Sequence, residues 1–479
     1  MNTRTDLDIL DGVLAQFAEL CRYPHPSYGE KPLADYVENL LRGWGLSPVR
    51  DAWDNIMADL PAAPGREGAP LTVIQGHLDR VCAVKPNSGY TPATSPVTPV
   101  VVDGVLRSDG NSSLGADNCL GNAVVLWLLE QDIPHGPVRL LFTTAEEVGL
   151  QGAKKVDPDW LAGASYLINT DGFVLGKAVV SSAGGLREKF SRPIETVTRK
   201  QQAAFQLELT GFPGGHSGYD IHRGRVNPIR AAAEFLRGLS VEYELLDING
   251  GHAENAIPMN CTVLLAVEQT DASALQEQTE RLSREMAGPN GGAVKLERVE
   301  NAPQTAWSIE SRDAVLTALC RMFTGVYAWR DKDKEQVSAS SNLGWVKQVD
   351  GQAVLSCFIR ASRQEDEDAV AAQHRETAEQ NGFSVVGRDS YLGWPERPGS
   401  KLTETLAAVW HGLTGRDMCI EAVHVGLEPS VLGTKNPAML MVNTGPDILD
   451  PHSLDERAPL AGLADYARLL AGTLDALSC

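Results

Sequence analysis

The sequence has no apolar run of about 18 residues, the length that a membrane-spanning helix needs. Its first residues are charged and follow a helical pattern rather than that of a secretory signal, which predicts a protein that is neither exported nor anchored. None of the eight cysteines forms a CxxC pair. Their wide spacing excludes thiolate zinc fingers and predicts reduced thiols in the cytoplasm.

Positive charge is scarce relative to negative charge. The chain has 42 Lys and Arg residues against 62 Asp and Glu residues, which gives a formal net charge of -20. This charge would repel a polyanion and no local basic cluster offsets it, so a nucleic-acid partner is not expected. Acidic excess usually marks solvated surface, although part of it can belong to a cation-binding site.

The chain is longer than one ordinary domain. Single hydrophobic cores usually stop growing at about 250–300 residues, whereas this chain has 479 residues. Hydrophobic residues make up 43% and charged residues 22%, which is typical of soluble globular proteins. We therefore expect two domains, each with ample material for a core.

Short apolar strands that run directly into acidic residues recur in the first part of the chain. The segments are "LTVIQGHLDRV", "PVRLLFTTAEEVGLQGA" and "ASYLINTDG", and the apolar helix "AVVLWLLE" lies between the first two. This pattern is typical of an open α/β sheet, which binds ligands outside the carboxyl ends of its strands. The polar residues that follow these strands are therefore expected to converge.

The pattern changes to alternating strands and amphipathic helices at about residue 187. A Pro- and Gly-rich segment at 391–402 reads as a boundary, after which the α/β pattern resumes. The sequence therefore predicts an α/β domain formed by residues 1–186 and 394–479. Residues 187–393 are expected to form an α+β domain inserted into it.

His77 and Asp79 stand on the same side of a strand end because side chains alternate along a strand. Asp79 can then orient the His77 imidazole, as carboxylates do for metal-bound histidines. Taken alone, a surface histidine beside an acid is the commoner explanation of such a pair. Glu146 and Glu147 directly follow an apolar strand, which favours a functional role, although paired glutamates also begin helices.

Asp117 lies in the glycine-bounded segment "GADNCLGNAV", immediately before the apolar helix. The residue can cap that helix through its carboxylate, or it can bind a metal together with residues from other strand ends. Asp171 ends a further strand and His452 lies in the late segment "DPHSLDE". Taken singly, they read as a turn residue and a loop histidine.

The complete series is more informative than any member. The order His77, Asp79, Asp117, Glu146, Glu147, Asp171, His452 resembles the M20 family of dinuclear zinc aminopeptidases and carboxypeptidases. The flanking segments resemble the aminoacyl-histidine (Xaa-His) dipeptidase branch of that family and extend from residue 76 to residue 457. These segments are "GHLDRV", "LGADNCLG", "TTAEEVGLQGA", "GGHSGYDIHRGRVNP", "NAIP", "SSNLG", "HVGLEPS" and "PHSLDER".

The resemblance implies a zinc-exopeptidase-like catalytic domain that holds two divalent metal ions. His77 and Asp171 would bind one ion, Glu147 and His452 the other, and Asp117 would bridge both. The glycines around Asp117 permit the bend that a bridging carboxylate needs. The family also has a cis peptide bond after this aspartate. Zn²⁺ is the expected ion because the ligands are nitrogen and carboxylate oxygen, with Mn²⁺ or Co²⁺ as alternatives.

The resemblance also assigns the residues that act on the substrate. Glu146 would be the general base that takes a proton from a metal-bridging water as it attacks the peptide carbonyl, with Asp79 supporting the site. His216 in "GGHSG" would stabilise the oxyanion from the inserted domain, which acts as a lid in the family. Without the resemblance, His216 reads as a turn histidine. Asn255 would add a polar contact, and Glu428 would help to hold the α-amino group of the substrate.

Three departures from the dipeptidase branch bear on substrate preference. Cys119 and Gly172 stand where glycine and serine are usual, and Pro429 follows Glu428 where the branch has cysteine. The implied ligands survive these changes, but the pocket differs. Hydrolysis of Xaa-His dipeptides is therefore weighed against a metal-dependent amidase or deacylase and against a catalytically silent binding protein. A homodimer through the inserted domain is common in the family.

Overall fold

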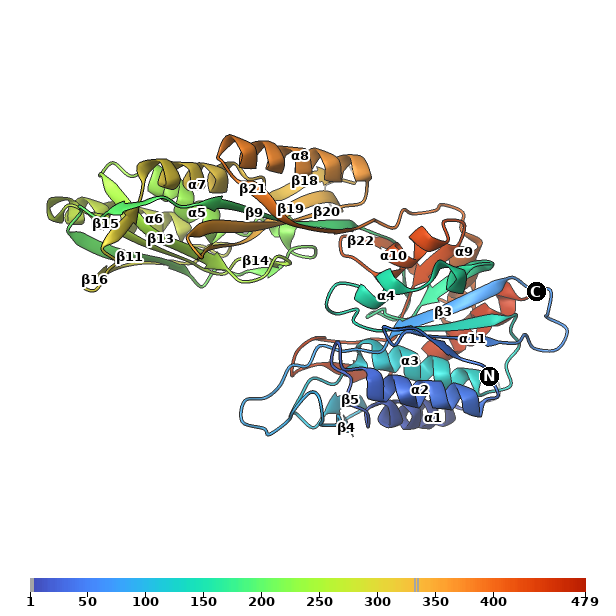
Figure 1. Cartoon of the computed structure of the whole chain (residues 1–479). Coiled ribbons are helices and arrows are strands. Elements are labelled where there is room, and N and C mark those ends of the chain that lie inside the picture. The colour runs from blue at the N-terminus through green and yellow to red at the C-terminus, as the bar shows by residue number, and fades with distance from the viewer. Residues whose placement is uncertain (1–3, 331–332, 334–335) are drawn as a thin grey trace. The chain divides into compact units, whose positions relative to one another are not determined.

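The computed structural model describes residues 4–330, 333 and 336–479, which form two compact units. The first unit comprises the chain up to Ser182 together with Trp394–Val423 and Leu427–Cys479. The second unit comprises Ala183–Gly393 and His424–Gly426. In Figure 1 the first unit is formed by the blue-to-teal and red ends of the chain, and the second by its green-to-orange middle.

The first unit is built on an eight-stranded sheet in the order β1-β2-β6-β3-β7-β23-β8-β22. The central strands β6, β3, β7 and β23 pair in parallel, and β1 and β2 form an antiparallel edge. A separate three-stranded sheet has the order β24-β5-β4. The strands are β1 (Val49–Arg50), β2 (Ile56–Leu60), β3 (Leu71–His77), β4 (Pro99–Val102), β5 (Val105–Ser108), β6 (Val138–Thr143), β7 (Ala164–Asn169), β8 (Lys177–Ser182), β22 (Cys419–Val423), β23 (Leu440–Asn443) and β24 (Arg457–Pro459).

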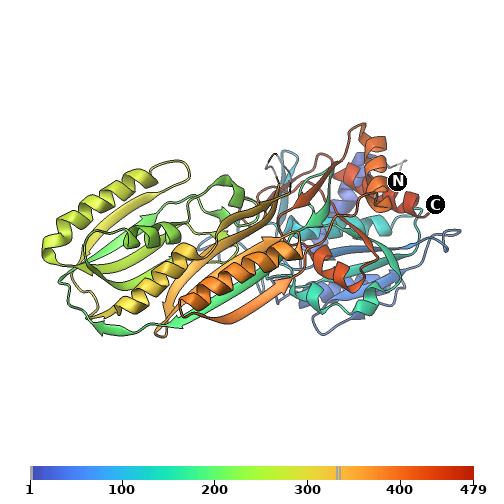
Figure 2. The same ribbon diagram turned by 90° about the horizontal axis from the view of Figure 1, so that it is seen from above.

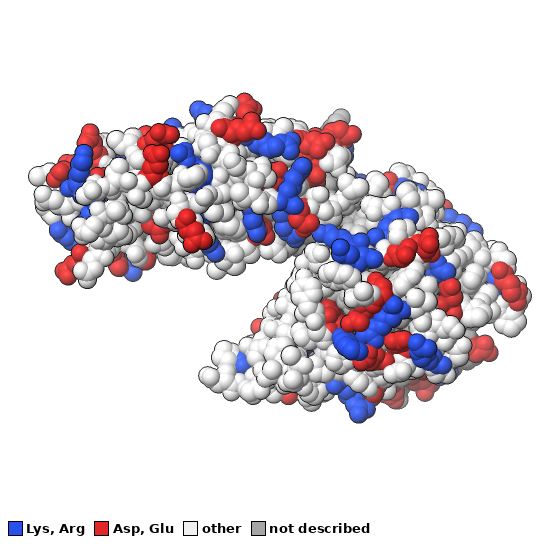
Figure 3. Space-filling view, in the orientation of Figure 1, with Lys and Arg blue, Asp and Glu red and all other residues white. Residues whose placement is uncertain are grey.

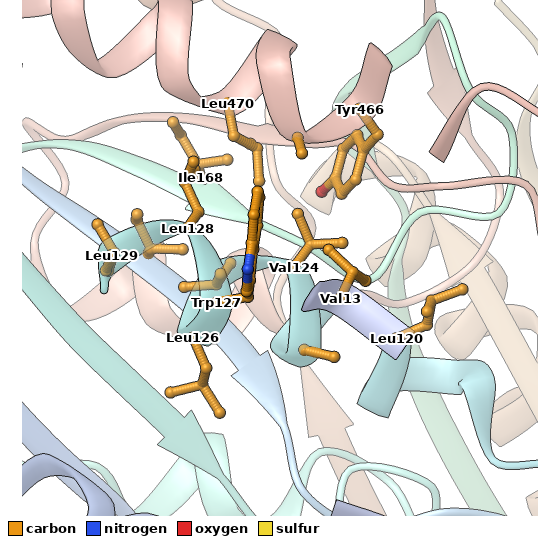
Figure 4. Close-up of a cluster of buried hydrophobic side chains, with 14 of the residues drawn as sticks. Val13, Leu120, Val124, Leu126, Trp127, Leu128, Leu129, Ile168, Tyr466 and Leu470 are labelled. Carbon is orange, nitrogen blue, oxygen red and sulfur yellow. The ribbon is translucent and has the colours of Figure 1, made fainter. Parts of the chain in front are cut away.

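Helix α3 forms the centre of the core of the first unit. All of its residues are buried, as expected for an apolar helix with no solvent-facing side. Figure 4 shows Trp127 of α3 among Leu470 and Tyr466 of α11 and Val13 of α1. The helices are α1 (Asp6–Leu20), α2 (Lys31–Gly43), α3 (Ala116–Leu129), α4 (Gln151–Lys155), the 3₁₀ helix η1 (Pro158–Leu161), α9 (Lys401–Thr414), α10 (Glu428–Lys435) and α11 (Leu463–Leu477).

The second unit contains a nine-stranded antiparallel sheet in the order β16-β11-β15-β13-β19-β20-β9-β21, with β18 also paired to β19. The strands are β9 (Gly184–Pro193), β11 (Ala203–Thr210), β13 (Tyr243–Gly251), β15 (Cys261–Val267), β16 (Ala293–Val299), β18 (Gly325–Trp329), β19 (Val337–Val349), β20 (Gln352–Ala361) and β21 (Ser384–Tyr391). The pairs β10 (Thr196–Thr198) with β17 (Thr305–Trp307) and β12 (Gly215–His216) with β14 (Ala256–Ile257) form two small sheets.

Amphipathic helices cover this sheet, and Figure 2 shows them lying along it. The burial pattern of β11 shows why helices cover one face of the sheet. Along most of β11, buried residues alternate with partly exposed ones, which gives the strand one buried face. The helices are α5 (Pro228–Arg237), α6 (Ala272–Met286), α7 (Ile309–Arg321) and α8 (Gln364–Gln380), with the 3₁₀ helices η2 (Ile221–Arg223) and η3 (Gln269–Asp271).

The predicted fold class, an α/β domain with an inserted α+β domain, is confirmed. Strand β9 begins at Gly184 and therefore runs across the boundary predicted at 186/187. Residues 424–426 belong to the second unit through contacts such as that between His424 Nε2 and Ser340 Oγ at 2.8 Å. The predicted domain boundaries stay predictions, since compactness alone does not define an independently folding domain.

The described surface carries charges of both signs. On the face drawn in Figure 3, acidic and basic side chains are interspersed over each unit. Among the described residues, no helix combines the length and the apolar character that crossing a bilayer requires.

Candidate active site

The candidate metal ligands of the first unit gather at one edge of its sheet. His77 is the last residue of β3, and Asp171 follows β7, its parallel neighbour. Glu147 follows β6, which pairs with β3 on the other side. The carboxyl ends of parallel strands share one edge of a sheet, so residues far apart in the sequence meet there. Asp117 reaches the same place from the first turn of α3.

Asp117 lies between two histidines and directs one carboxylate oxygen to each. Its Oδ1 is 3.0 Å from Nε2 of His77, and its Oδ2 is 3.0 Å from Nε2 of His452. His77 Nε2 is also 3.4 Å from Oδ1 of Asp171, and His452 Nε2 is 3.1 Å from Oε1 of Glu147. The side chains thus form two groups, His77–Asp117–Asp171 and Asp117–Glu147–His452, in which the candidate ligand atoms lie within 4.8 Å of one another.

The donor atoms fit divalent cations. Oε1 of Glu147 and Oδ1 of Asp171 are buried, and each lies beside the Nε2 atom of a histidine in its group. Buried charged oxygens are costly unless a cation or a hydrogen-bond donor satisfies them. Imidazole nitrogen and carboxylate oxygen are ligands that suit Zn²⁺ and related ions. A cation in each group would satisfy these oxygens.

The pKa values show how strongly this cluster attracts positive charge. Burial lowers the pKa of His77, but Asp171 and Asp117 outweigh that effect and raise it well above its ordinary value. Burial likewise lowers the pKa of His452, whereas hydrogen bonds with Asp117 and Glu147 raise it to about 11. The carboxylates therefore hold protons on both imidazoles where no cation is bound.

Glu146 lies beside these groups in a different environment from its neighbour Glu147. Burial is the main cause that raises the pKa of Glu146 well above its ordinary value, and the carboxylates of Glu147 and Asp171 add to it. A carboxyl group with a raised pKa is suited to accept and return a proton. Glu146 also forms a candidate metal-binding group with His77 and Glu147, which would make it a ligand instead.

Asp79 supports both sides of the cluster. Nδ1 of His77 is 3.0 Å from the main-chain oxygen of Asp79 and 3.5 Å from its carboxylate Oδ1. The carboxylate instead accepts the main-chain N–H groups of Glu146 and Glu147, at 2.9 and 3.2 Å, and the hydroxyl of Ser27 at 2.7 Å. Asp79 therefore fixes the turn that carries both glutamates, a role that the sequence analysis did not anticipate because nothing local shows where that turn lies.

Glu456 holds the turn that presents Asp117. Its Oε2 accepts the main-chain N–H of Gly115 at 2.8 Å, and its Oε1 accepts that of Asp117 at 3.3 Å. Gly115 has a φ of 73°, a left-handed conformation that glycine adopts without strain. The Asp117–Asn118 peptide bond is cis, as the family resemblance implied. Sequence analysis missed Glu456, although the segment "PHSLDER" contains it.

Comparisons with known proteins identify the family. The model of the M20 peptidase dimerisation domain matches residues 200–291, and that of peptidase family M28 matches residues 55–221. The cytosol non-specific dipeptidase of Escherichia coli is 32% identical over 471 residues, which cover 95% of each chain. The chain belongs to the M20 family of metallopeptidases.

Solved structures of other peptidases resemble this M20 peptidase over almost its whole length. The aminoacylhistidine dipeptidase from Vibrio alginolyticus is similar with a TM-score of 0.82 and 29% identity, covering 97% of this chain and 96% of the other. The aminopeptidase PepT from Bacillus cereus has a TM-score of 0.56 at 17% identity, covers 98% of this chain and 99% of its own, and so shares the fold.

Glu428 of the M20 peptidase lies at the first position of α10 and is buried. Its Oε2 accepts a hydrogen bond from Nε2 of Gln75, two residues before His77. Its Oε1 is buried and has no hydrogen-bond partner among the described residues. Burial raises the pKa of Glu428 above its usual value. One carboxylate oxygen of Glu428 is thus left for a further partner.

His216 and Asn255 lie together in the second unit. His216 is in β12, which pairs with β14, and the main-chain N–H of the following Ser217 donates to the main-chain oxygen of Asn255 at 2.9 Å. The sheet β12-β14 therefore brings two predicted substrate contacts into one place. Their roles in catalysis stay predictions.

Arg360 is a further candidate that the sequence analysis missed. It lies in β20, is buried, and its guanidinium is 3.3 Å from Ser217 Oγ, 3.3 Å from Tyr391 Oη and 3.5 Å from His216 Nε2. None of these partners in the described chain is a carboxylate. Burial lowers the pKa of Arg360. A buried guanidinium without an acidic partner is suited to bind an anion. The signal in the sequence was an arginine within the apolar strand "AVLSCFIRAS".

Proposed function

We propose that this M20 peptidase hydrolyses dipeptides, Xaa-His dipeptides among them, at a centre that holds two Zn²⁺ ions. The observation that carries the proposal is the division of the Asp117 carboxylate between two histidine–carboxylate groups. The names of the Escherichia coli and Vibrio alginolyticus relatives support the substrate class, one as non-specific and one as aminoacylhistidine dipeptidase. The proposed ligands are His77, Asp117, Glu147, Asp171 and His452.

The proposed chemistry is general-base hydrolysis. Two divalent ions held by the proposed ligands would supply Lewis acidity to the peptide carbonyl and to water near neutral pH. A carboxylate oxygen of Glu146 takes a proton from the attacking water as the new C–O bond forms and the carbonyl π electrons move onto the carbonyl oxygen. Glu146 then gives that proton to the leaving nitrogen as the C=O bond re-forms and the C–N bond breaks. Asp79 keeps Glu146 in place by accepting its main-chain N–H.

We propose substrate contacts in each unit by itself. Glu428, with its unpaired Oε1, would bind the α-ammonium group. Arg360 would bind the α-carboxylate, since its present partners are uncharged side chains of the second unit. His216 would donate to the oxyanion and Asn255 would add a polar contact. A substrate with a free α-ammonium group would be preferred over an N-acyl amino acid.

The proposed setting is a cytosolic homodimer. The match of residues 200–291 to a peptidase dimerisation domain supports association of two copies. The word "cytosol" in the name of the Escherichia coli relative supports the compartment.

Metal analysis combined with a panel of amide substrates tests the proposed function. The panel contains alanyl-histidine, alanyl-alanine, N-acetyl-histidine and a tripeptide, and the metal content is measured by emission spectroscopy. We expect about two Zn²⁺ per chain and turnover of the dipeptides alone. Preferential turnover of N-acetyl-histidine would instead establish a deacylase, and a protein with one metal ion or none would contradict the dinuclear centre.

A further inference from the structure

Three amide side chains form a ladder across adjacent strands below the candidate metal centre. Asn443 of β23 lies opposite Asn169 of β7, and Asn169 lies opposite Gln75 of β3. Nδ2 of Asn443 donates to Oδ1 of Asn169 at 2.5 Å, and Nδ2 of Asn169 donates to Oε1 of Gln75 at 2.7 Å. Nε2 of Gln75 then donates to Oε2 of Glu428. Every link in this ladder donates in the same direction, toward the carboxylate.

The ladder is rigid because its members are buried and its orientation is determined. Gln75, Asn169 and Asn443 are each at most 3% exposed. Nε2 of Gln75 also donates to the hydroxyl of Thr143 at 3.1 Å, so both of its N–H groups are used. If the Gln75 amide were flipped, its oxygen would face Glu428 and its N–H groups would face Nδ2 of Asn169. Either change would leave a buried group unsatisfied.

Gln75, the last member of the ladder, holds the Glu428 carboxylate together with the hydroxyl of Thr143. Oε2 receives the N–H of Gln75, whereas Oε1 is buried without a hydrogen-bond partner in the described chain. A carboxylate held at one oxygen cannot rotate freely, so the direction of the other is fixed. An ammonium group binds such an oxygen more strongly than a neutral donor does, because opposite charges assist the hydrogen bond.

We infer that the amide ladder Asn443–Asn169–Gln75 aims Oε1 of Glu428 and so determines selectivity for substrates with a free α-ammonium group. Gln75 is a positioning residue in this scheme, since it acts through Glu428 and touches no substrate. The inference rests on the proposed role of Glu428 in binding that ammonium group. It adds that the selectivity depends on neighbouring strands of the sheet as well as on Glu428 itself.

The test compares two substrates that differ only in the amino group. Alanyl-histidine and propionyl-histidine share the scissile amide and the methyl group, but the second lacks the α-ammonium. For the Gln75→Met variant we expect KM for alanyl-histidine to rise by about tenfold or more, while kcat changes less than about threefold. The kinetic constants for propionyl-histidine, or its inhibition constant if turnover is too slow, should stay within about threefold of the parent values. Metal content should not change.

The control variant is Gln206→Met, which makes the same chemical change in the second unit, where Gln206 Nε2 donates to Glu208. It should leave both substrates unaffected. If the parent enzyme does not prefer alanyl-histidine, the proposed ammonium role of Glu428 is wrong. If the parent does and Gln75→Met keeps the full preference, the ladder inference is overturned while the proposed function stands.

A second variant keeps the inference testable if Gln75→Met fails to fold or loses metal. Asn443→Ala removes the far end of the ladder, two links from Glu428. It should raise KM for alanyl-histidine by a smaller factor, about two- to fivefold, and leave the constants for propionyl-histidine unchanged. An equal effect on both substrates would overturn the inference.

Discussion

Glu146 and Glu147 are adjacent in the sequence, but we propose different roles for them, general base for Glu146 and metal ligand for Glu147. Oε1 of Glu147 is 3.1 Å from Nε2 of His452, in the group that shares Asp117. Glu146 belongs to neither of the groups that share Asp117, and burial raises its pKa well above its ordinary value. The main-chain N–H groups of both residues are fixed by Asp79, so their side chains cannot simply exchange places.

Separate substitutions of Glu146 and Glu147 test which glutamate is the general base and which is a metal ligand. Glu146→Gln should keep both metal ions but lower kcat by at least about 10²-fold, because an amide cannot accept the proton of the attacking water. Glu147→Ala should lower both the metal content and the activity. The measurement is metal content together with steady-state kinetics. The reverse pattern, with metal lost from Glu146→Gln only, would exchange the two assignments.

Metal binding should release protons at neutral pH. In the protein without metal, hydrogen bonds with Asp117 and Glu147 outweigh burial and raise the pKa of His452 to about 11, so this imidazole is protonated at pH 7. A cation binds only the neutral imidazole, so binding must displace that proton, and metal affinity should rise with pH. Titration calorimetry in buffers of different ionisation enthalpy should give about one proton released or more. A release of zero would contradict this account.

At the scale of elements, the turn before α3 depends on a residue from the other end of the chain. Glu456 and Gly115 are 341 positions apart, yet the Glu456 carboxylate accepts N–H groups on both sides of the turn. Helix α3 is buried along its whole length, so its start cannot shift without disturbing the core. Glu456 therefore fixes the direction of Asp117 relative to both histidines.

Glu456→Gln should weaken metal binding without unfolding the protein. The amide has the same shape but only one acceptor oxygen, so one of the two N–H groups loses its partner. We expect metal affinity to fall by about 10–100-fold, the usual effect of removing a group that supports a ligand. Competition with a chelator measures it. The matched control is Glu421→Gln, which changes the β22 glutamate that pairs with Lys177 of β8. This variant should not change metal affinity.

At the scale of the whole molecule, the residues with proposed roles fall into two sets, one in each unit. The proposed ligands, Glu146 and Glu428 belong to the first unit, whereas His216, Asn255 and Arg360 belong to the second. Residues of the second unit should therefore affect turnover without affecting metal binding.

His216→Ala tests this separation. If His216 stabilises the oxyanion, kcat should fall by about 10²–10³-fold while the metal content stays at the parent level. His222→Ala provides a control at a nearby histidine of η2 in the same unit. An unchanged kcat in His216→Ala would contradict the oxyanion role and would leave His216 as a turn residue.

Local patterns in the sequence were enough to predict the fold class, whereas the set of metal ligands came from the resemblance of the complete series to the M20 family. Apolar strands that end in His77, Asp171 and the glutamate pair indicate a parallel sheet with chemistry at its edge, since strand patterns depend only on neighbouring residues. The glycine beside Asp117 and the cis bond that the family resemblance implied are likewise properties of a short segment. These features needed no long-range information.

The tertiary structure decided which groups support the proposed ligands. The Asp79 carboxylate accepts main-chain N–H groups of the turn that carries both glutamates, and the Glu456 carboxylate accepts those of the turn before α3. Strand register places the amides of Gln75, Asn169 and Asn443 side by side. The tertiary structure also placed the guanidinium of Arg360 beside the hydroxyl groups of Ser217 and Tyr391. Each of these contacts joins distant positions whose meeting depends on strand order and register. The sequence by itself thus determined the chemistry available, and the packing of the sheet decided where each carboxylate and amide points.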